Sequence, residues 1–178
     1  MIRYTEASTK AYEILHQVQK EWFPLLQEAI IKILFDTKKR KKGRHLILAS
    51  IRKSSDLIRK LTDNLADEGC DYIIFLDQVV FENISDEDRI RLIRHELRHC
   101  KIAGSPEKPK YQIIPHDIED FIIEIELNQD NVDWAKKVTE LAETIYEQIE
   151  VQKKEDEKTM KGNASIKIKR RKILTGNV

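Results

Sequence analysis

The sequence of 178 residues lacks the marks of several large protein classes. It has only two cysteines, Cys70 and Cys100, which are too few for a disulfide framework. No apolar run approaches the roughly 20 residues that span a bilayer. The N-terminal segment MIRYTEASTK has neither the basic start nor the apolar stretch of a secretory signal. We therefore expect a cytoplasmic protein with no membrane partner.

The net charge is also small, although charged residues are abundant. They make up 35% of the chain but nearly cancel to +1, which argues against a uniformly basic nucleic-acid binder and leaves only local patches. With 40% apolar residues and only five glycines and four prolines, the composition predicts a packed core.

Hydrophobic periodicity predicts an α+β fold with a small three- to four-stranded mixed sheet. Strand-like runs occupy residues 29–35, 45–51 and 72–77, and 111–115 is short and extended. The segment 36–44 between the first two is a hairpin-like loop. Helices are expected at 5–22, 54–71, 78–84, 85–103, 116–127 and 131–158. We expect a domain at 1–130, a long amphipathic helix at 131–160, and a basic tail or late strand at 161–178.

The stretch RLIRHELRHC places His95, Glu96 and His99 in the pattern His-Glu-x-x-His. Histidines four apart lie on one helix face and can supply two converging zinc ligands. Glu96 is then placed to take a proton from a water on the metal. The alternative is a solvated helix with two incidental histidines. The helix geometry favours the metal site, because each of three sectors of the helix surface, one with the histidines, one apolar and one basic, has a single chemical character. Arg91, Arg94, Arg98 and Lys101 form the basic sector beside the histidines.

A catalytic zinc site needs a third protein ligand. His116 in IIPHDIEDF is the favoured candidate, because the chain before it is long enough to return over the histidine helix; Glu119 is the rival. His16 and His45 are interpreted as structural or surface residues. Cys100 falls in the core sector, which favours a buried thiol over a fourth ligand. Tyr111 could hydrogen-bond an oxyanion, but packing is the favoured interpretation.

These motifs resemble the phage metallopeptidases, a family of small zincin-like proteins of phages and prophages with a layout related to SprT-like peptidases. The matching stretches cover residues 4 to about 125 and include YTEAS, EWFPLL, KSSDLIRKLT, DYIIFLD, ISDEDRIRLIRHELRHC and YQIIPHDIEDF. The resemblance implies a zincin-like domain with its sheet packed on the active-site helix, Zn²⁺ on His95, His99 and His116, and Glu96 as catalytic residue. It also implies that the protein is encoded by a phage or prophage, and that it would then be located in the cytoplasm of the bacterial host. This chain has Arg98 where family members often have cysteine.

Three basic clusters are candidate sites for nucleic-acid contact, although a solvated surface is the favoured interpretation of each one. They are the loop Lys38, Lys39, Arg40, Lys41 and Lys42, the helix residues Arg91, Arg94 and Arg98, and the C-terminal Lys169, Arg170 and Arg171. No aromatic residues interleave with them, which argues against stacking on bases.

Two functional hypotheses follow. The first is a zinc metallopeptidase that cuts a protein or peptide substrate, with Glu96 as general base and later general acid. The second is a non-catalytic module of the same fold that binds nucleic acid or a host protein through the basic clusters. The sequence leaves the substrate and the oligomeric state open.

Overall fold

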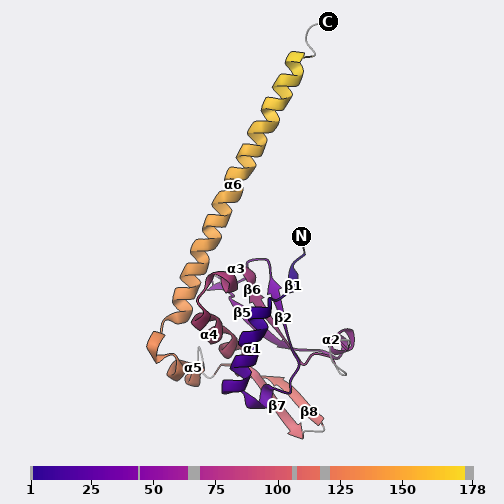
Figure 1. The fold of residues 1–178 in the computed structure, drawn as a ribbon, viewed down its shortest axis with the longest axis vertical. Coiled ribbons are helices and arrows are strands. Elements are labelled where there is room, and N and C mark those ends of the chain that lie inside the picture. The colour runs from indigo at the N-terminus through magenta and orange to yellow at the C-terminus, as the bar shows by residue number, and fades with distance from the viewer. Residues whose placement is uncertain (1, 44, 64–68, 106–107, 117–120, 175–178) are drawn as a thin grey trace. The chain divides into compact units, whose positions relative to one another are not determined.

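The computed structural model describes residues 2–43, 45–63, 69–105, 108–116 and 121–174 (Figure 1). The chain divides into two compact units, residues 1–139 and 140–178. The first unit is mixed α/β and contains all three histidines of interest. Glu119, the rival third ligand, lies outside the described residues.

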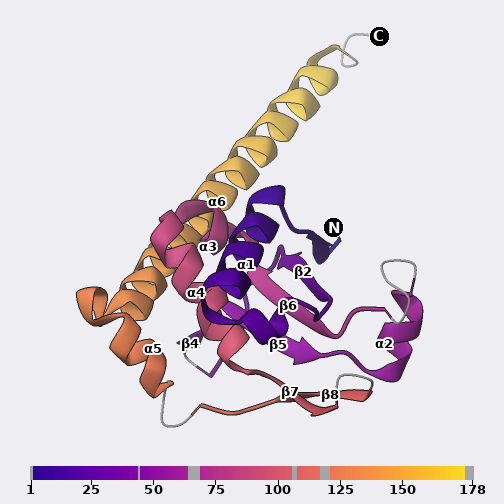
Figure 2. The same cartoon turned by 60° about the horizontal axis from the view of Figure 1, so that its bottom comes forward.

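A four-stranded mixed sheet forms the centre of the first unit (Figures 1 and 2). Its strand order is β1 (Tyr4–Glu6), β2 (Ile31–Asp36), β6 (Tyr72–Asp77) and β5 (Ala49–Lys53). β2 and β6 run parallel, and the two end strands are each antiparallel to their neighbour. The predicted small mixed sheet is confirmed.

The buried face of the sheet is built from residues in register. Ile33 lies opposite Ile74, which lies opposite Ile51, so three β-branched side chains form a row across three strands. All three are buried. Because side chains alternate along a strand, this row defines the face that carries the core.

Helices α1 (Thr9–Trp22) and α4 (Asp86–Arg98) pack against each other, and α4 packs on β5. Ser8 caps α1, because its hydroxyl accepts a hydrogen bond from the Ala11 amide. Ser85 caps α4 in the same way, with the Asp88 amide as donor. The short α3 (Gln78–Asn83) precedes α4, and its place also agrees with the prediction. A turn of 3₁₀ helix, η1 (Pro24–Leu26), follows α1.

Some predicted boundaries were wrong because tertiary pairing overrode local pattern. Thr5 does not begin a helix; it lies in β1, opposite Phe35. The predicted strand 45–51 is split, since β4 (His45–Leu46) pairs with β3 (Lys41–Lys42) in a hairpin separate from the main sheet. The predicted helix 54–71 falls partly on residues 64–68, which lie outside the described residues; α2 spans Asp56–Leu61.

The largest correction concerns the end of α4, which was expected near Ala103. The helix ends at Arg98, with His99 as its C-cap, and Cys100–Ser105 forms strand β7. β7 pairs antiparallel with β8 (Lys108–Ile113) in a two-stranded ribbon, and this pairing satisfies backbone groups that a longer helix would have used. Gly104 has φ +90°, and a Cβ there would lie 2.5 Å from the Lys108 carbonyl oxygen, so the strand requires glycine.

The chain continues through α5 (Ile122–Leu127) and the 3₁₀ turn η2 (Gln129–Asn131) into α6 (Trp134–Leu174). The predicted helix 116–127 falls partly on residues 117–120, which lie outside the described residues. Of the apolar side expected for it, Phe121 is buried but Ile122 and Ile125 are exposed, and the buried side chain of α5 is Glu124.

The second unit contains the C-terminal part of α6, which is helical through Leu174. Residues 161–174 are thus not a late strand. None of the described helices is both long enough and apolar enough to cross a membrane.

Candidate metal centre

Three histidines from two segments meet beside α4. His95 lies in the last turn of the helix, His99 is its C-cap, and His116 follows strand β8. One ring nitrogen of each lies within 4.8 Å of the others, and His95 Nε2 is 3.1 Å from His116 Nε2. Three converging imidazoles at this separation can hold one metal ion. The ligand group found among the described residues consists of these three.

A reciprocal backbone contact fixes the orientation of His99. Its Nδ1 lies 2.7 Å from the Ile114 carbonyl oxygen, while the Ile114 amide donates to the His99 carbonyl oxygen at 2.9 Å. A proton on Nδ1 donated to that carbonyl leaves the lone pair on Nε2, so Nε2 is the atom suited to bind a metal. The same contact holds the chain two residues before His116.

Phe121 closes one side of the histidine cluster. Its ring centroid lies 5.6 Å from that of His95, 4.9 Å from that of His99 and 5.0 Å from that of His116. The side chain is only 4% exposed. An aromatic wall of this kind excludes water from one side of the site and limits the rotamers of all three rings.

A buried ionic cluster attaches α5 to α4 on the side next to the histidines. Glu124 is fully buried and accepts hydrogen bonds from Arg94 at 2.9 Å and from Arg98 at 3.0 Å. Arg94 also donates to Asn128 Oδ1 at 2.5 Å. Arg94 and Arg98 directly precede the two histidines of α4, so the residues that fix α5 alternate with the residues that face the metal centre.

The arginine side of α4 is therefore not the solvated basic face expected from the sequence. Arg94 is only 6% exposed, and Arg91 pairs with Asp88 and Asp130. The guanidinium of Arg94 lies over the Trp22 ring at 5.1 Å, and that of Arg98 lies over the Phe23 ring at 4.7 Å. Nucleic-acid contact by these arginines stays a prediction.

Glu96 lies between the histidine cluster and the edge strand β5. Its carboxyl is 6% exposed, and burial raises its pKa to about 7 in the metal-free chain. The positive charges of His95 and Arg40 and a hydrogen bond with the Ile51 backbone oppose this rise. A carboxyl whose pKa is near neutral can both accept and release a proton at physiological pH.

His95 and Glu96 reach a common pocket of about 210 Å³. Its wall is largely apolar and includes Leu46, Ile47, Leu48, Ala49, Leu92, Trp134 and Ala135. The predicted proton-transfer residue and one predicted ligand thus face a hollow bounded by the segment that leads into β5. Such a hollow can receive a side chain of a bound peptide.

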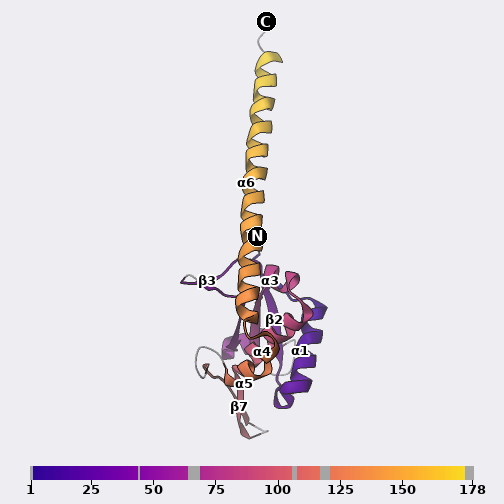
Figure 3. The ribbon, with the colours of Figure 1, turned by 90° about the vertical axis from the view of Figure 1, so that its left-hand side faces the viewer.

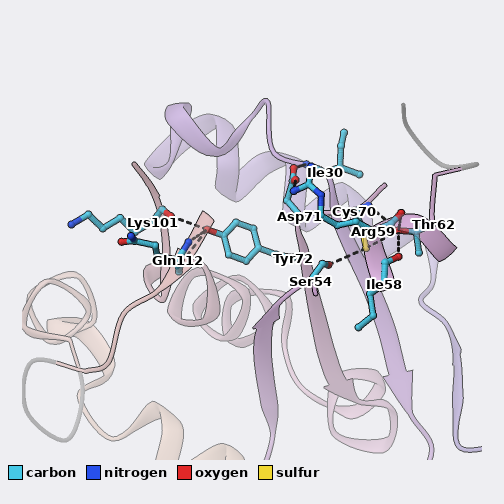
Figure 4. Close-up of polar contacts among 10 residues, drawn as sticks. All are labelled: Ile30, Ser54, Ile58, Arg59, Thr62, Cys70, Asp71, Tyr72, Lys101 and Gln112. Atoms are coloured by element: carbon cyan, nitrogen blue, oxygen red, sulfur yellow. Dashed lines mark hydrogen bonds and ion pairs between the residues drawn. The ribbon is translucent and has the colours of Figure 1, made fainter. Parts of the chain in front are cut away.

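A second network holds the β7–β8 ribbon, which connects His99 to His116 (Figure 4). The Tyr72 hydroxyl donates to the Lys101 carbonyl at 2.9 Å and accepts from the Gln112 amide at 3.2 Å, so it joins both strands of the ribbon to β6. Next to it, Asp71 accepts from the Ile30 amide and from Arg59. Removal of the Tyr72 hydroxyl would loosen the connection between two of the three histidines.

The other residues considered from the sequence lie elsewhere. Tyr111 packs edge-on against Tyr72 with ring centroids 5.6 Å apart, as the packing interpretation expected. Cys100 is half-buried in β7 rather than buried in the helix, and burial raises the pKa of its thiol. His16 and His45 are both exposed.

Sequence reasoning missed four contributors: the Ile114 carbonyl, Phe121, Glu124 and Arg40. A backbone carbonyl leaves no sequence signal. Phe121 and Glu124 looked like one apolar and one polar position of an ordinary helix. The available signal was the repeat Arg94-His95 and Arg98-His99, since two arginines four apart on a partly buried helix require a carboxylate partner.

Comparison with known families gives one result. The model of the family described as "Putative phage metallopeptidase" matches residues 2–146, which is most of the chain and includes all three histidines and Glu96. Comparisons with curated proteins and with solved structures find no match. The chain therefore belongs to the phage metallopeptidase family.

Proposed function

We propose that this protein is a zinc-dependent metallopeptidase with a zincin-type active site on α4. The observation that carries the proposal is the convergence of His95, His99 and His116 beside a buried Glu96. Membership of a metallopeptidase family agrees with this chemistry.

The donor set fits zinc. Three neutral imidazoles leave one position open in a tetrahedral site, which is the arrangement of catalytic rather than structural zinc. The Ile114 carbonyl favours the His99 tautomer that binds through Nε2. A zinc ion held there supplies a Lewis acid and makes its bound water acidic near neutral pH.

The residues of the chain itself divide the remaining tasks. Glu96 Oε accepts a proton from the attacking water and later delivers it to the leaving amine. Phe121 keeps solvent from one side, and the Arg94–Glu124 and Arg98–Glu124 contacts hold the helix that begins next to Phe121. His116 completes the site only if the ribbon that leads to it stays in place.

The edge of β5 offers a path for a peptide. The Leu48 carbonyl accepts a hydrogen bond from the Asp77 amide, and the Ser54 amide donates to the Asp71 carbonyl. The backbone groups of even-numbered residues in this segment therefore bond toward β6. Backbone groups alternate sides along a strand, and those of Ala49 and Ile51 therefore face the outer edge. An extended substrate could add to the sheet there by β-augmentation and reach the pocket that contains Glu96.

Metal analysis and a peptidase assay test the proposal together. We expect about one zinc per chain, and a Glu96→Gln variant that keeps zinc but loses hydrolysis of an unfolded protein by about 10³-fold, because proton transfer is removed. Glu13→Gln, on an exposed face of α1, is the matched control and should behave as wild type.

Two results would argue against this function. A His95→Ala/His99→Ala variant that retained stoichiometric zinc would contradict the ligand assignment. Zinc-loaded wild type with no hydrolysis above that of Glu96→Gln would instead support the non-catalytic alternative.

A further inference from the structure

The β3–β4 hairpin is the most strongly basic described surface near the pocket. Between Asp36 and Leu46 the sequence TKKRKKGRH carries six lysines and arginines and no acidic residue. Lys38, Lys41 and Lys42 are exposed, and none forms an ion pair with a carboxylate in the described ranges. The hairpin projects from the sheet in Figure 3. Within the described residues, Lys38, Lys41 and Lys42 therefore present unneutralised charge to solvent.

Arg40 differs from the lysines, because it anchors the hairpin. Its guanidinium lies 3.0 Å from Asp36 Oδ2, donates to the Ser50 hydroxyl at 2.9 Å, and donates to the Phe75 carbonyl at 3.3 Å. Its own carbonyl accepts from the Ile47 amide at 2.9 Å. These contacts tie the base of the hairpin to β2, β5 and β6, so the backbone that carries the lysines is anchored next to β5.

The hairpin continues directly into the wall of the pocket. Lys41 pairs across the hairpin with Leu46, the first of four consecutive residues that line the pocket with His95 and Glu96. Leu46 and Ala49 are three residues apart, about 10 Å along an extended chain. If a peptide pairs with the outer edge of β5 at Ala49, the peptide side chains about three to five residues from that position would reach the lysines.

We propose that Lys38, Lys41 and Lys42 bind an acidic segment of the protein substrate, about three to five residues from the position that pairs with Ala49. The inference rests on the proposed peptidase function and specifies its substrate class. Charge complementarity identifies the partner: three unneutralised ammonium groups favour carboxylate side chains and repel basic ones. An acidic peptide is favoured over nucleic acid because the hairpin extends the peptide path and contains no Phe, Tyr or Trp for stacking on bases.

The test uses zinc-loaded full-length Glu96→Gln protein, so that binding is measured without cleavage. The probes are fluorescein-labelled peptides that share a leucine-rich centre. Each peptide has one flank of four glutamates, four serines or four lysines, which precedes the centre in one set of peptides and follows it in the other. We expect the glutamate peptide to bind at least tenfold more tightly than the lysine peptide, on one side of the centre only. The preference should shrink as salt rises, because exposed charges are screened.

Two variants locate the effect. Adding Lys41→Glu/Lys42→Glu to Glu96→Gln should reverse the preference, and Lys41→Gln/Lys42→Gln should abolish it. The control Lys153→Glu/Lys154→Glu makes the same charge change on exposed positions of α6 and should preserve the preference. Zinc content and circular dichroism establish that each variant is folded.

Several outcomes would overturn the inference. They are equal binding of the three peptides, binding of none at low salt, and a preference that survives Lys41→Glu/Lys42→Glu. Tighter hairpin-dependent binding of a labelled single-stranded DNA than of any peptide would assign the hairpin to nucleic acid instead. Cleavage by the wild-type protein is scored separately: zinc-dependent hydrolysis without a flank preference rejects only the acidic-segment inference, whereas absence of hydrolysis rejects the peptidase proposal.

Discussion

Helices α4 and α5 both border the histidine cluster, but different residues of the two helices are buried. On α4, Leu92, Ile93 and Leu97 are buried, as periodicity predicts. On α5 the isoleucines face outward, and the fully buried side chain is Glu124. The difference arises because α4 supplies two inward arginines, and α5 supplies the one carboxylate with which both of them pair.

This comparison shows how an ionic contact can decide which face of a short helix is buried. A six-residue helix such as α5 gains little from its own apolar stripe. Two arginines left without a partner would cost several kcal/mol, roughly as much as burying two isoleucines would return. Orientation by Glu124 also places Phe121, which precedes α5, against the three imidazoles.

The largest expected effect is the loss of that carboxylate. Glu124→Ala should lower the free energy of unfolding by about 3–5 kcal/mol, because Arg94 and Arg98 would lose their buried partner. Zinc affinity should fall as well, since α5 and Phe121 would no longer be held beside the histidines. Urea denaturation and competition with a zinc-binding dye measure the two effects. Glu126→Ala, on an exposed position of the same helix, is the control, and equal losses in both variants would refute the role of Glu124.

A pair of isoleucine substitutions sharpens the contrast between the helices. Ile93→Ala on α4 should cost about 2–4 kcal/mol, because it opens a cavity in the core. Ile123→Ala on α5 should change the free energy of unfolding by no more than about 0.5 kcal/mol, because that side chain is 50% exposed. Urea denaturation of both variants at one pH is sufficient. A cost at Ile123 as large as that at Ile93 would mean that α5 buries its apolar face after all.

The same contrast separates what the sequence predicts from what it does not. Long-range convergence of His116 with His95 and His99 was predictable, because a helical pair at spacing four needs a third donor and the chain offered few. Strand β6 was also predictable, as a nearly continuous apolar run. The end of α4 at Arg98 was not, since local helix signals continue past it and only pairing with β8 turns Cys100–Ser105 into a strand. The inward face of α5 was not predictable either, because periodicity assigns charges to solvent and is blind to a partner 30 residues away.

Glu96 provides the most selective test, since its carboxyl is buried on α4 itself. Its pKa of about 7 in the metal-free chain lies above the ordinary value of 4.5, so the folded state holds a proton that the unfolded state releases in this range. Its contribution to stability is therefore complete below about pH 4.5 and is lost as pH rises through 7. With a chelator present, wild type should lose about 2–3 kcal/mol more than Glu96→Gln between pH 4.5 and pH 8.

Urea denaturation at the two pH values measures this loss, and titration of groups that do not interact with Glu96 cancels in the difference between the two proteins. Saturating zinc should reduce the difference, because a nearby cation favours the ionised carboxylate. Glu13→Gln, on the exposed face of α1, should retain the wild-type dependence. An identical pH dependence in wild type and Glu96→Gln would mean that the carboxyl is hydrated, and it would remove the reason to expect proton transfer by this side chain near neutral pH.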